Sequence, residues 1–240
     1  MKNFKAIYSI NFYKNPRSPK KIVYLIYHYT GIASEKKAIQ RLTSKSSRVS
    51  CHYFIRRNGE IINMVPDKFI AWHAGVSSWK NHKNLNDKSI GIEIQNSGHS
   101  GKYERFSNKQ IKSLLFLTKV LKKKYLIKNK NVLGHSDIAA NRKKDPGEKF
   151  PWKYLAKQKI GIWFNLPKNL KLRDSKVSTK EKKLFYFYLK KIGYYIQKRS
   201  KHSRFVIRAF QRRYRSNKIN GKIDIECLEI AKNLIKRGLN

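Results

Sequence analysis

Residues 134–147 read GHSDIAANRKKDPG, and the fold we predict is built around this segment. The short apolar run NVLG leads into it, which predicts a buried strand at residues 131–134. The segment then holds a histidine, His135, together with two carboxylates, Asp137 and Asp145, and two lysines, Lys143 and Lys144. Polar groups on a turn-rich loop at the end of a strand are typical of a functional site.

Two further segments predict strands of the same sheet. Residues 21–30, KIVYLIYHYT, are almost continuously apolar and aromatic, which is typical of a buried central strand, and His28 lies near its end. Residues 89–96, SIGIEIQN, alternate in character, so three isoleucines share one face and Glu93 lies on the other. A lone carboxylate in an apolar strand is expected to have a raised pKa unless it is paired.

The segments around these strands predict a hairpin and helices. An Asn-Gly pair lies between two strand-like runs in residues 50–65, which is a strong hairpin signal. Residues 34–48 and 107–124 space their apolar residues as helices do, and the second begins with a capping box. Residues 1–20 are polar and predict an extended lead-in. This order predicts an α/β fold with a mixed central sheet flanked by helices.

The C-terminal part of the chain differs in composition. Residues 167–177, PKNLKLRDSKV, are polar and lack periodicity, so we interpret them as a linker. Apolar residues at helical spacing then predict three helices. The chain is therefore predicted to have two domains: an α/β domain at residues 1–166 and a small all-α three-helix domain at residues 178–240.

The charge of the chain is extreme, because its 240 residues carry a formal net charge of +42. One interpretation is a polyanionic partner such as nucleic acid, an acidic membrane surface or an acidic wall polymer. The other is a lysine-rich composition that fills every solvated face. The charge is spread along the whole chain and no nucleic-acid-binding motif is visible, so we expect no specific nucleic acid partner.

Composition also limits the location and the covalent chemistry that we expect. The sequence has no run of 18 or more apolar residues, so no transmembrane helix is predicted. The first 21 residues lack the apolar core of a secretory signal. Cys51 and Cys227 lie far apart in the sequence, and we expect no disulfide between them.

The polar residues at the strand ends suggest metal chemistry. His28, His135 and Asp145 each lie at a predicted strand end or in the adjoining loop, and all three are suitable zinc ligands. Zinc lowers the pKa of bound water to about 7, and Glu93 suits the proton carrier that such a site needs. Lys143 or Lys144 suits the positive group that stabilises a developing oxyanion, and spacing does not decide between them.

A series of motifs strengthens this interpretation: NFYKNP, LIYHYTG, SCHYFIRRNGEIINMV, AWHAG, NDKSIGIEIQN, GHSDIA and KKDPG. In this order they resemble the family 2 N-acetylmuramoyl-L-alanine amidases, the AmpD and AmiD group. These are zinc amidases that share a fold with a phage lysozyme and the peptidoglycan recognition proteins. The resemblance covers residues 10–165. One departure is Ala140, where the group usually has proline after Asp-Ile-Ala.

The resemblance implies a role for each residue of the site. His28, His135 and Asp145 are implied as ligands of one Zn²⁺, Glu93 as the catalytic acid and base, and Lys143 as the oxyanion stabiliser. The motif AWHAG is implied to line the substrate groove with four residues: Trp72, His73, Ala74 and Gly75. From the residues alone, Trp72 either lines a groove or plugs the core.

The C-terminal motif VIRAFQRRYR, with LKKIGYYI before it and INGKID after it, resembles peptidoglycan-binding domain 1 modules. The whole chain is therefore predicted to be a monomeric zinc enzyme. It would cleave the amide between N-acetylmuramic acid, intact or 1,6-anhydro, and L-alanine in peptidoglycan or muropeptides. The alternative is a protein that binds wall fragments without cutting them. A wall-binding module favours the cell envelope, whereas the missing signal leaves the cytoplasm open.

Overall fold

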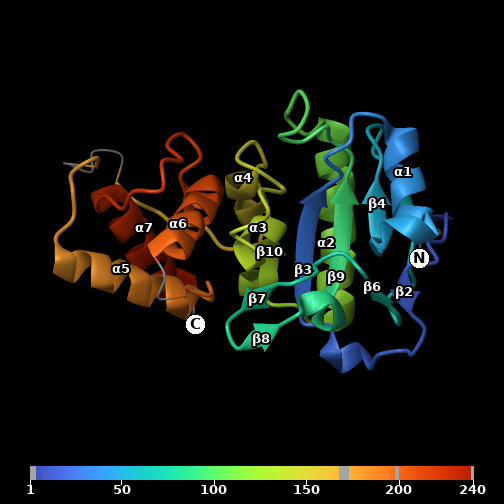
Figure 1. Cartoon of the computed structure of the whole chain (residues 1–240), viewed down its shortest axis with the longest axis horizontal. Helices are drawn as coiled ribbons and strands as arrows, with labels where there is room; N and C mark the ends of the chain where they lie inside the picture. The colour runs from blue at the N-terminus through green and yellow to red at the C-terminus, as the bar shows by residue number, and fades with distance from the viewer. Residues whose placement is uncertain (1–3, 168–172, 198–199, 239–240) are drawn as a thin grey trace.

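A mixed sheet forms the centre of the molecule (Figure 1), which we describe from a computed structural model for residues 4–167, 173–197 and 200–238. Its strand order is β1-β5-β4-β9-β3-β10. These strands are β1 (Lys5–Ala6), β3 (Tyr24–Tyr29), β4 (Tyr53–Ile55), β5 (Ile61–Asn63), β9 (Ser89–Ile94) and β10 (Val132–Gly134). Neighbours run parallel except β4 and β5, which form the expected hairpin.

Two small sheets and the helices surround this centre. The small sheets pair β2 (Phe12–Tyr13) with β6 (Ile70–Ala71), and β7 (Ser78–Trp79) with β8 (His82–Lys83). The α-helices are α1 (Glu35–Thr43), α2 (Asn108–Tyr125), α3 (His135–Ile138), α4 (Trp152–Lys157), α5 (Thr179–Ile192), α6 (Ser200–Tyr214) and α7 (Ile225–Gly238). Short 3-10 helices are η1 (Pro19–Lys21), η2 (Lys45–Ser47), η3 (Leu85–Lys88) and η4 (Asn129–Asn131). In the part of the chain that the structure describes, no helix has the length and apolar character to cross a membrane.

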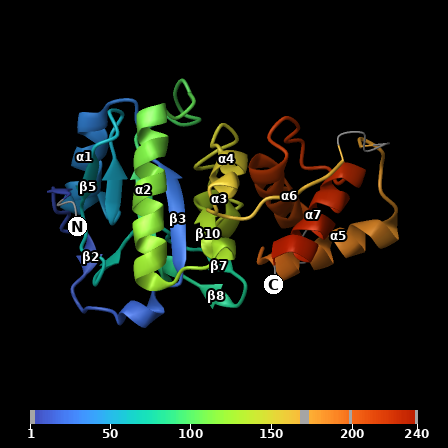
Figure 2. The same cartoon turned by 180° about the vertical axis from the view of Figure 1, so that it is seen from behind.

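Helix α2 covers one face of the sheet, as Figure 2 shows from behind. The capping box predicted for its start is present, because Ser107 and Gln110 each accept the other's backbone N–H. The apolar side of α2 packs on the alternating isoleucines of β9: Ile90, Ile92 and Ile94. This face is therefore a dry core, and no polar side chain of the site points toward it.

The opposite face of the sheet carries the polar residues that we singled out. Helix α1 packs beside Phe54 of β4 at one end, and Ile26 of β3 joins the core of the C-terminal helices at the other. The parallel register of β3 and β9 pairs His28 with Glu93. These two residues thus lie side by side on the face away from α2, between the two covered ends.

The C-terminal helices α5, α6 and α7, coloured orange to red in Figure 1, gather beside α3 and α4. Their core is continuous with that of the sheet, since Leu133 of β10 and Ile138 of α3 share one buried cluster with Phe185, Leu189 and Phe210. The described end of the predicted linker also packs, because Val177 is buried and Ser175 accepts the N–H of Ile225. Residues 168–172 of that linker lie outside the described residues.

The fold class predicted from the sequence is confirmed: a mixed sheet with flanking helices, followed by a helical region. The predicted extended lead-in contains the edge strand β1, which pairs with β5. One local prediction is wrong in extent. The helix predicted at residues 34–48 ends at Thr43. Serine side chains explain this end, because Ser47 donates to the carbonyl of Ser44 and competes with helical bonding.

Candidate metal centre

Three side chains from distant parts of the sequence converge at the open face of the sheet. His28 comes from β3, His135 begins α3 directly after β10, and Asp145 lies in the loop that follows. Nδ1 of His28 lies 2.9 Å from Nδ1 of His135, and each nitrogen lies 3.0 Å from Oδ2 of Asp145. All three side chains are buried. These are the three residues that the sequence predicts as ligands.

A chain of hydrogen bonds determines where the proton of His28 lies. Ser89 donates its hydroxyl hydrogen to the carbonyl of Leu85, so its oxygen accepts from Nε2 of His73, 3.2 Å away. Nδ1 of a neutral His73 is then an acceptor, and Nε2 of His28 lies 3.0 Å from it. Burial lowers the pKa of His28 to about 4 and the pKa of His73 well below its usual range. At neutral pH, His28 therefore carries its proton on Nε2 and a lone pair on Nδ1.

His135 is oriented in the same way by a backbone group. Its Nε2 lies 3.1 Å from the carbonyl oxygen of Ala74. A carbonyl only accepts, so Nε2 carries a hydrogen, and Nδ1 is the nitrogen that can offer a lone pair to a cation. Arg142 donates to the same carbonyl and to that of Val76, which holds this oxygen in place.

The three converging atoms form a site for a cation. Two imidazole lone pairs and a carboxylate oxygen at 2.9–3.0 Å repel one another unless a positive charge lies between them. Burial raises the pKa of Asp145, but the charge and hydrogen bonds of the histidines, when their Nδ1 atoms are protonated, hold it well below its usual range, and a cation between the three atoms would act in the same direction. Two histidines and one carboxylate match the three-ligand set of catalytic zinc, which leaves a fourth position open.

Glu93 lies next to this cluster with an unsatisfied carboxylate. Its Oε2 is buried and has no hydrogen-bond partner among the described residues. Burial, and then the negative charge of Asp145, raise the pKa of Glu93 to about 8, while Lys143 opposes the rise. The raised pKa that the sequence predicted for a lone carboxylate in this strand is thus present. An acid with a pKa near neutrality is suited to accept and release a proton.

A cavity of about 580 Å³ opens over the cluster, and both candidate lysines line it together with Glu93, His135 and Asp145. Lys143 is half-buried, whereas Lys144 is exposed. Lys143 also acts on the pKa values of His28 and Glu93, which places its charge over the site. These observations favour Lys143 as the positive group.

The four residues of AWHAG take different places. Trp72 lines the cavity, and its indole Nε1 has no partner among the residues described. His73 and Ala74 are buried and hold the two histidine ligands through His28 Nε2 and His135 Nε2. Gly75 is exposed and lies against Arg142. Their assignment as substrate-binding residues stays a prediction, and the contacts of His73 and Ala74 add an orienting role.

Sequence reasoning missed the residues behind the ligands. Ser89 completes the bonding of His73, and Gly91 makes room for it, because a Cβ on Gly91 would lie 2.3 Å from Cγ of His73. His52, which the sequence indicates as structural or as part of a cleft wall, was not missed: it is buried beneath, accepts the N–H of Gly91 at Nδ1 and contacts Arg17, so it is structural. One sequence feature could have indicated that a side chain packs closely here: Gly91 lies two residues before Glu93 on the same face of a strand.

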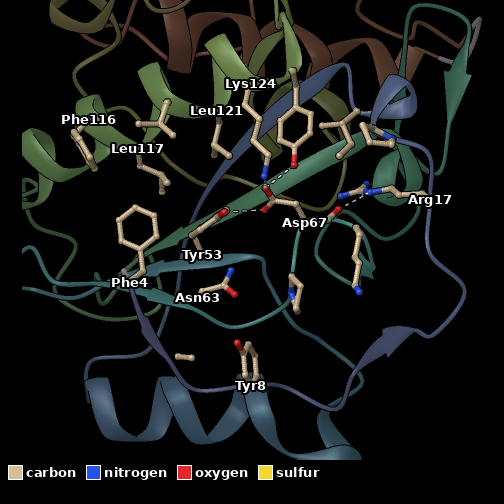
Figure 3. A pocket seen from close by; sticks show the side chains of 17 residues that line it. Phe4, Tyr8, Arg17, Tyr53, Asn63, Asp67, Phe116, Leu117, Leu121 and Lys124 are labelled. Carbon is tan, nitrogen blue, oxygen red and sulfur yellow. Dashed lines mark hydrogen bonds and ion pairs between the residues drawn. The ribbon is translucent and has the colours of Figure 1, made fainter. Parts of the chain in front are cut away.

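A larger cavity of about 850 Å³ lies apart from the cluster, between α2 and the N-terminal segment (Figure 3). Its walls are mainly apolar, with Phe4 and Phe116 among them. The carboxylate of Asp67 in this cavity accepts from three groups: Tyr53, Tyr125 and Lys124. Both oxygens of Asp67 are thus hydrogen-bonded, whereas Oε2 of Glu93 has no partner among the described residues, so the smaller cavity is the candidate active site.

The sequence can be compared with known proteins. A family model described as N-acetylmuramoyl-L-alanine amidase matches residues 18–148. N-acetylmuramoyl-L-alanine amidase AmiD of Escherichia coli is 36% identical over 233 residues, which cover 90% of this chain and 83% of that protein. The 1,6-anhydro-N-acetylmuramyl-L-alanine amidase AmpD of Escherichia coli is 43% identical over 105 residues, 44% of this chain and 55% of AmpD.

Two solved structures resemble nearly the whole chain. AmiD from Escherichia coli, in complex with anhydro-N-acetylmuramic acid-L-Ala-D-gamma-Glu-L-Lys, superposes with a TM-score of 0.82 at 34% identity, over 95% of this chain and 93% of that one. AmpDh3 from Pseudomonas aeruginosa, in complex with anhydromuramic pentapeptide, superposes with a TM-score of 0.80 at 30% identity, over 98% of both chains. Together with the geometry of the cluster, these likenesses show that the chain belongs to the N-acetylmuramoyl-L-alanine amidase family.

Proposed function

We propose that this protein is a zinc-dependent amidase. It hydrolyses the bond between the lactyl group of N-acetylmuramic acid, intact or 1,6-anhydro, and the L-alanine of a stem peptide. The observation that carries the proposal is the convergence of three lone-pair atoms beside an unpaired Glu93 oxygen, in a cavity open to a substrate. Family membership supports the reaction type.

The proposed mechanism assigns proton transfer to Glu93. When bound, zinc supplies a Lewis acid that polarises a carbonyl and lowers the pKa of water to about 7. The carboxylate of Glu93 takes a proton from the attacking water and returns it to the nitrogen of the leaving alanine. Its lack of a hydrogen-bond partner among the described residues leaves Oε2 available for both transfers.

Lys143 and its neighbours supply positive charge. The ammonium group of Lys143 stabilises negative charge that develops on the amide oxygen. Three further cations line the same cavity: Arg41, Arg142 and Lys144. Stem peptides carry carboxylates, so a cationic rim suits this substrate class.

The nature of the substrate is supported by the two relatives solved with ligands. AmiD was solved with an anhydro-muramyl tripeptide and AmpDh3 with an anhydromuramic pentapeptide. We propose that this chain also takes muropeptides of the anhydro type. The helical region at residues 178–240 resembles wall-binding modules. For that reason we propose that polymeric peptidoglycan is a second substrate and that the protein acts in the cell envelope. We also propose that it acts as a monomer.

Product analysis tests the proposal directly. The purified chain is incubated with anhydro-muropeptides and, separately, with intact sacculi, and released stem peptides are identified by mass spectrometry. We expect free peptides that begin with L-alanine, loss of activity with a chelator and recovery with zinc. Binding of muropeptides without release of peptide, by a chain that contains zinc, would instead support a protein that binds wall fragments without cutting them.

A further inference from the structure

The loop that carries two of the three ligands is held from outside the central sheet. Asp137, two residues after His135, is buried, and its carboxylate accepts three donors. Gly134 donates its backbone N–H at 2.8 Å, Tyr194 its hydroxyl at 2.7 Å, and Arg213 its guanidinium. Tyr194 and Arg213 both belong to the C-terminal helical region, so the side chain that caps α3 depends on that region.

Arg213 of α6 reaches deep into the amidase fold. A second nitrogen of its guanidinium donates to the carbonyl of Val132 at 3.1 Å, and the group lies 3.9 Å from the ring centre of Trp152. Val132 begins β10, the strand that leads directly to His135. The side chains of Arg213 and Asp137 are only 3% and 1% exposed, so neither charge has water as an alternative partner.

A second contact of α6 holds the other end of the loop. Arg212 forms an ion pair with Glu148 at 3.7 Å, and Glu148 also pairs with His99 at 3.0 Å. Glu148 lies three residues after Asp145. The backbone next to His135 is also joined to that of Asp145, because Ser136 donates its N–H to the carbonyl of Asp145 at 2.8 Å.

We propose that α6 is a positioning element of the metal site, and that Arg213 and Tyr194 orient His135 through Asp137. The inference rests on the proposed metal centre and gives the helical region a role beyond wall binding. Without Arg213, Asp137 is a buried charge with its main partner removed, and it must move toward water. His135 is in the same short helix, so its ring moves with it, and misplacement of a metal ligand lowers metal affinity.

Zinc affinity of the full chain tests this proposal without relying on catalysis. We expect Arg213→Met to weaken zinc binding by about 10- to 100-fold in competition with a chromophoric chelator. The absorption spectrum of the cobalt-loaded variant should change as well, because it reports ligand geometry. Arg215→Met is the matched control, since Arg215 is equally buried but pairs with Asp224 inside the helical region. It should destabilise the fold to a similar degree and leave zinc affinity unchanged.

Tyr194→Phe decides the question if Arg213→Met does not fold. It removes one hydroxyl from Asp137 and keeps the aromatic ring, which packs on Trp79 with ring centres 4.9 Å apart. We expect a loss of zinc affinity of about 2- to 10-fold. Unchanged affinity in Tyr194→Phe, or in folded Arg213→Met, would overturn the proposal, as would an equal loss in Arg215→Met. If the unaltered chain binds no zinc, the proposed function itself fails.

Discussion

Among single residues, Glu93 shows how burial creates reactivity. It lies on a strand face beside His28, and burial raises its pKa to about 8. We expect Glu93→Gln to lower kcat by about 10²- to 10⁴-fold, because the amide cannot accept a proton. Zinc content should stay at one ion per chain, since Glu93 is not among the converging ligand atoms.

The matched control for this variant is Glu104→Gln. The side chain of Glu104 is 41% exposed and pairs with that of Arg57, and neither residue lines the cavity. Its turnover should equal that of the unaltered chain. Turnover of Glu93→Gln at the same level, measured on an anhydro-muropeptide, would refute the role of Glu93 as proton carrier.

Asp67 predicts the pH dependence of stability. Burial raises the pKa of Asp67, but hydrogen bonds from Tyr125, Lys124 and Tyr53 outweigh this effect and lower the pKa below its ordinary value. A folded-state pKa below the unfolded value of about 3.9 stabilises the fold above that pH, and this contribution is lost as pH falls through the folded pKa. We expect Asp67→Asn to cost about 1–3 kcal/mol at neutral pH.

The difference between Asp67→Asn and the unaltered chain should begin to shrink as the pH falls below about 4, where the carboxylate of the unfolded chain becomes protonated, and should be lost once the pH falls below the lower pKa of the native carboxylate. Urea unfolding at neutral pH and at two acidic pH values measures it. A difference that is the same at every pH would show that the charge of Asp67 contributes nothing, and that the variant acts through packing alone.

At the level of elements, β9 serves two purposes on its two faces. Its isoleucines pack under α2, whereas Gly91 and Glu93 face the site. We expect Gly91→Ala to weaken zinc binding by about 10-fold or more, because the new methyl group displaces His73 and so releases His28. Zinc titration against a chelator measures the loss.

Ile92→Val provides the control within the same strand. It alters the face under α2 and should cost about 0.5–1.5 kcal/mol of stability with zinc affinity unchanged. If Gly91→Ala binds zinc as tightly as Ile92→Val does, then His73 does not need its present position to orient the ligand.

Elements with strong local signals were predicted well. The capping box of α2 and the alternation of β9 depend on neighbouring residues alone, so the sequence contains all the information needed. The two-residue strand β1 has no such signal, since it is defined by pairing with β5. The early end of α1 depended on serine side chains that favour a turn over a helix.

For the molecule as a whole, the metal should contribute to folding. The candidate ligands come from β3, α3 and the following loop, so a bound ion would join parts of the chain that separate on unfolding. At a free zinc concentration of about 100 times Kd, the free energy of unfolding should rise by about 2.7 kcal/mol. Thermal unfolding with zinc and with a chelator measures this change.

The control for zinc stabilisation is Asp145→Asn, which removes the charged ligand. Its unfolding temperature should respond weakly to zinc. An equal response in Asp145→Asn and in the unaltered chain would mean that zinc binds elsewhere, for example at exposed side chains.

The sequence by itself determined the fold class, the identity of the candidate ligands and the family, because these depend on residue types, periodicity and motif order. Only the tertiary structure decided how the ligands are held. His73, Ser89 and Ala74 orient the two histidines, and Arg213 pairs with Asp137 across the junction of sheet and helices. Such contacts join residues far apart in the chain, and a hydrogen bond between them depends on packing that no local pattern records.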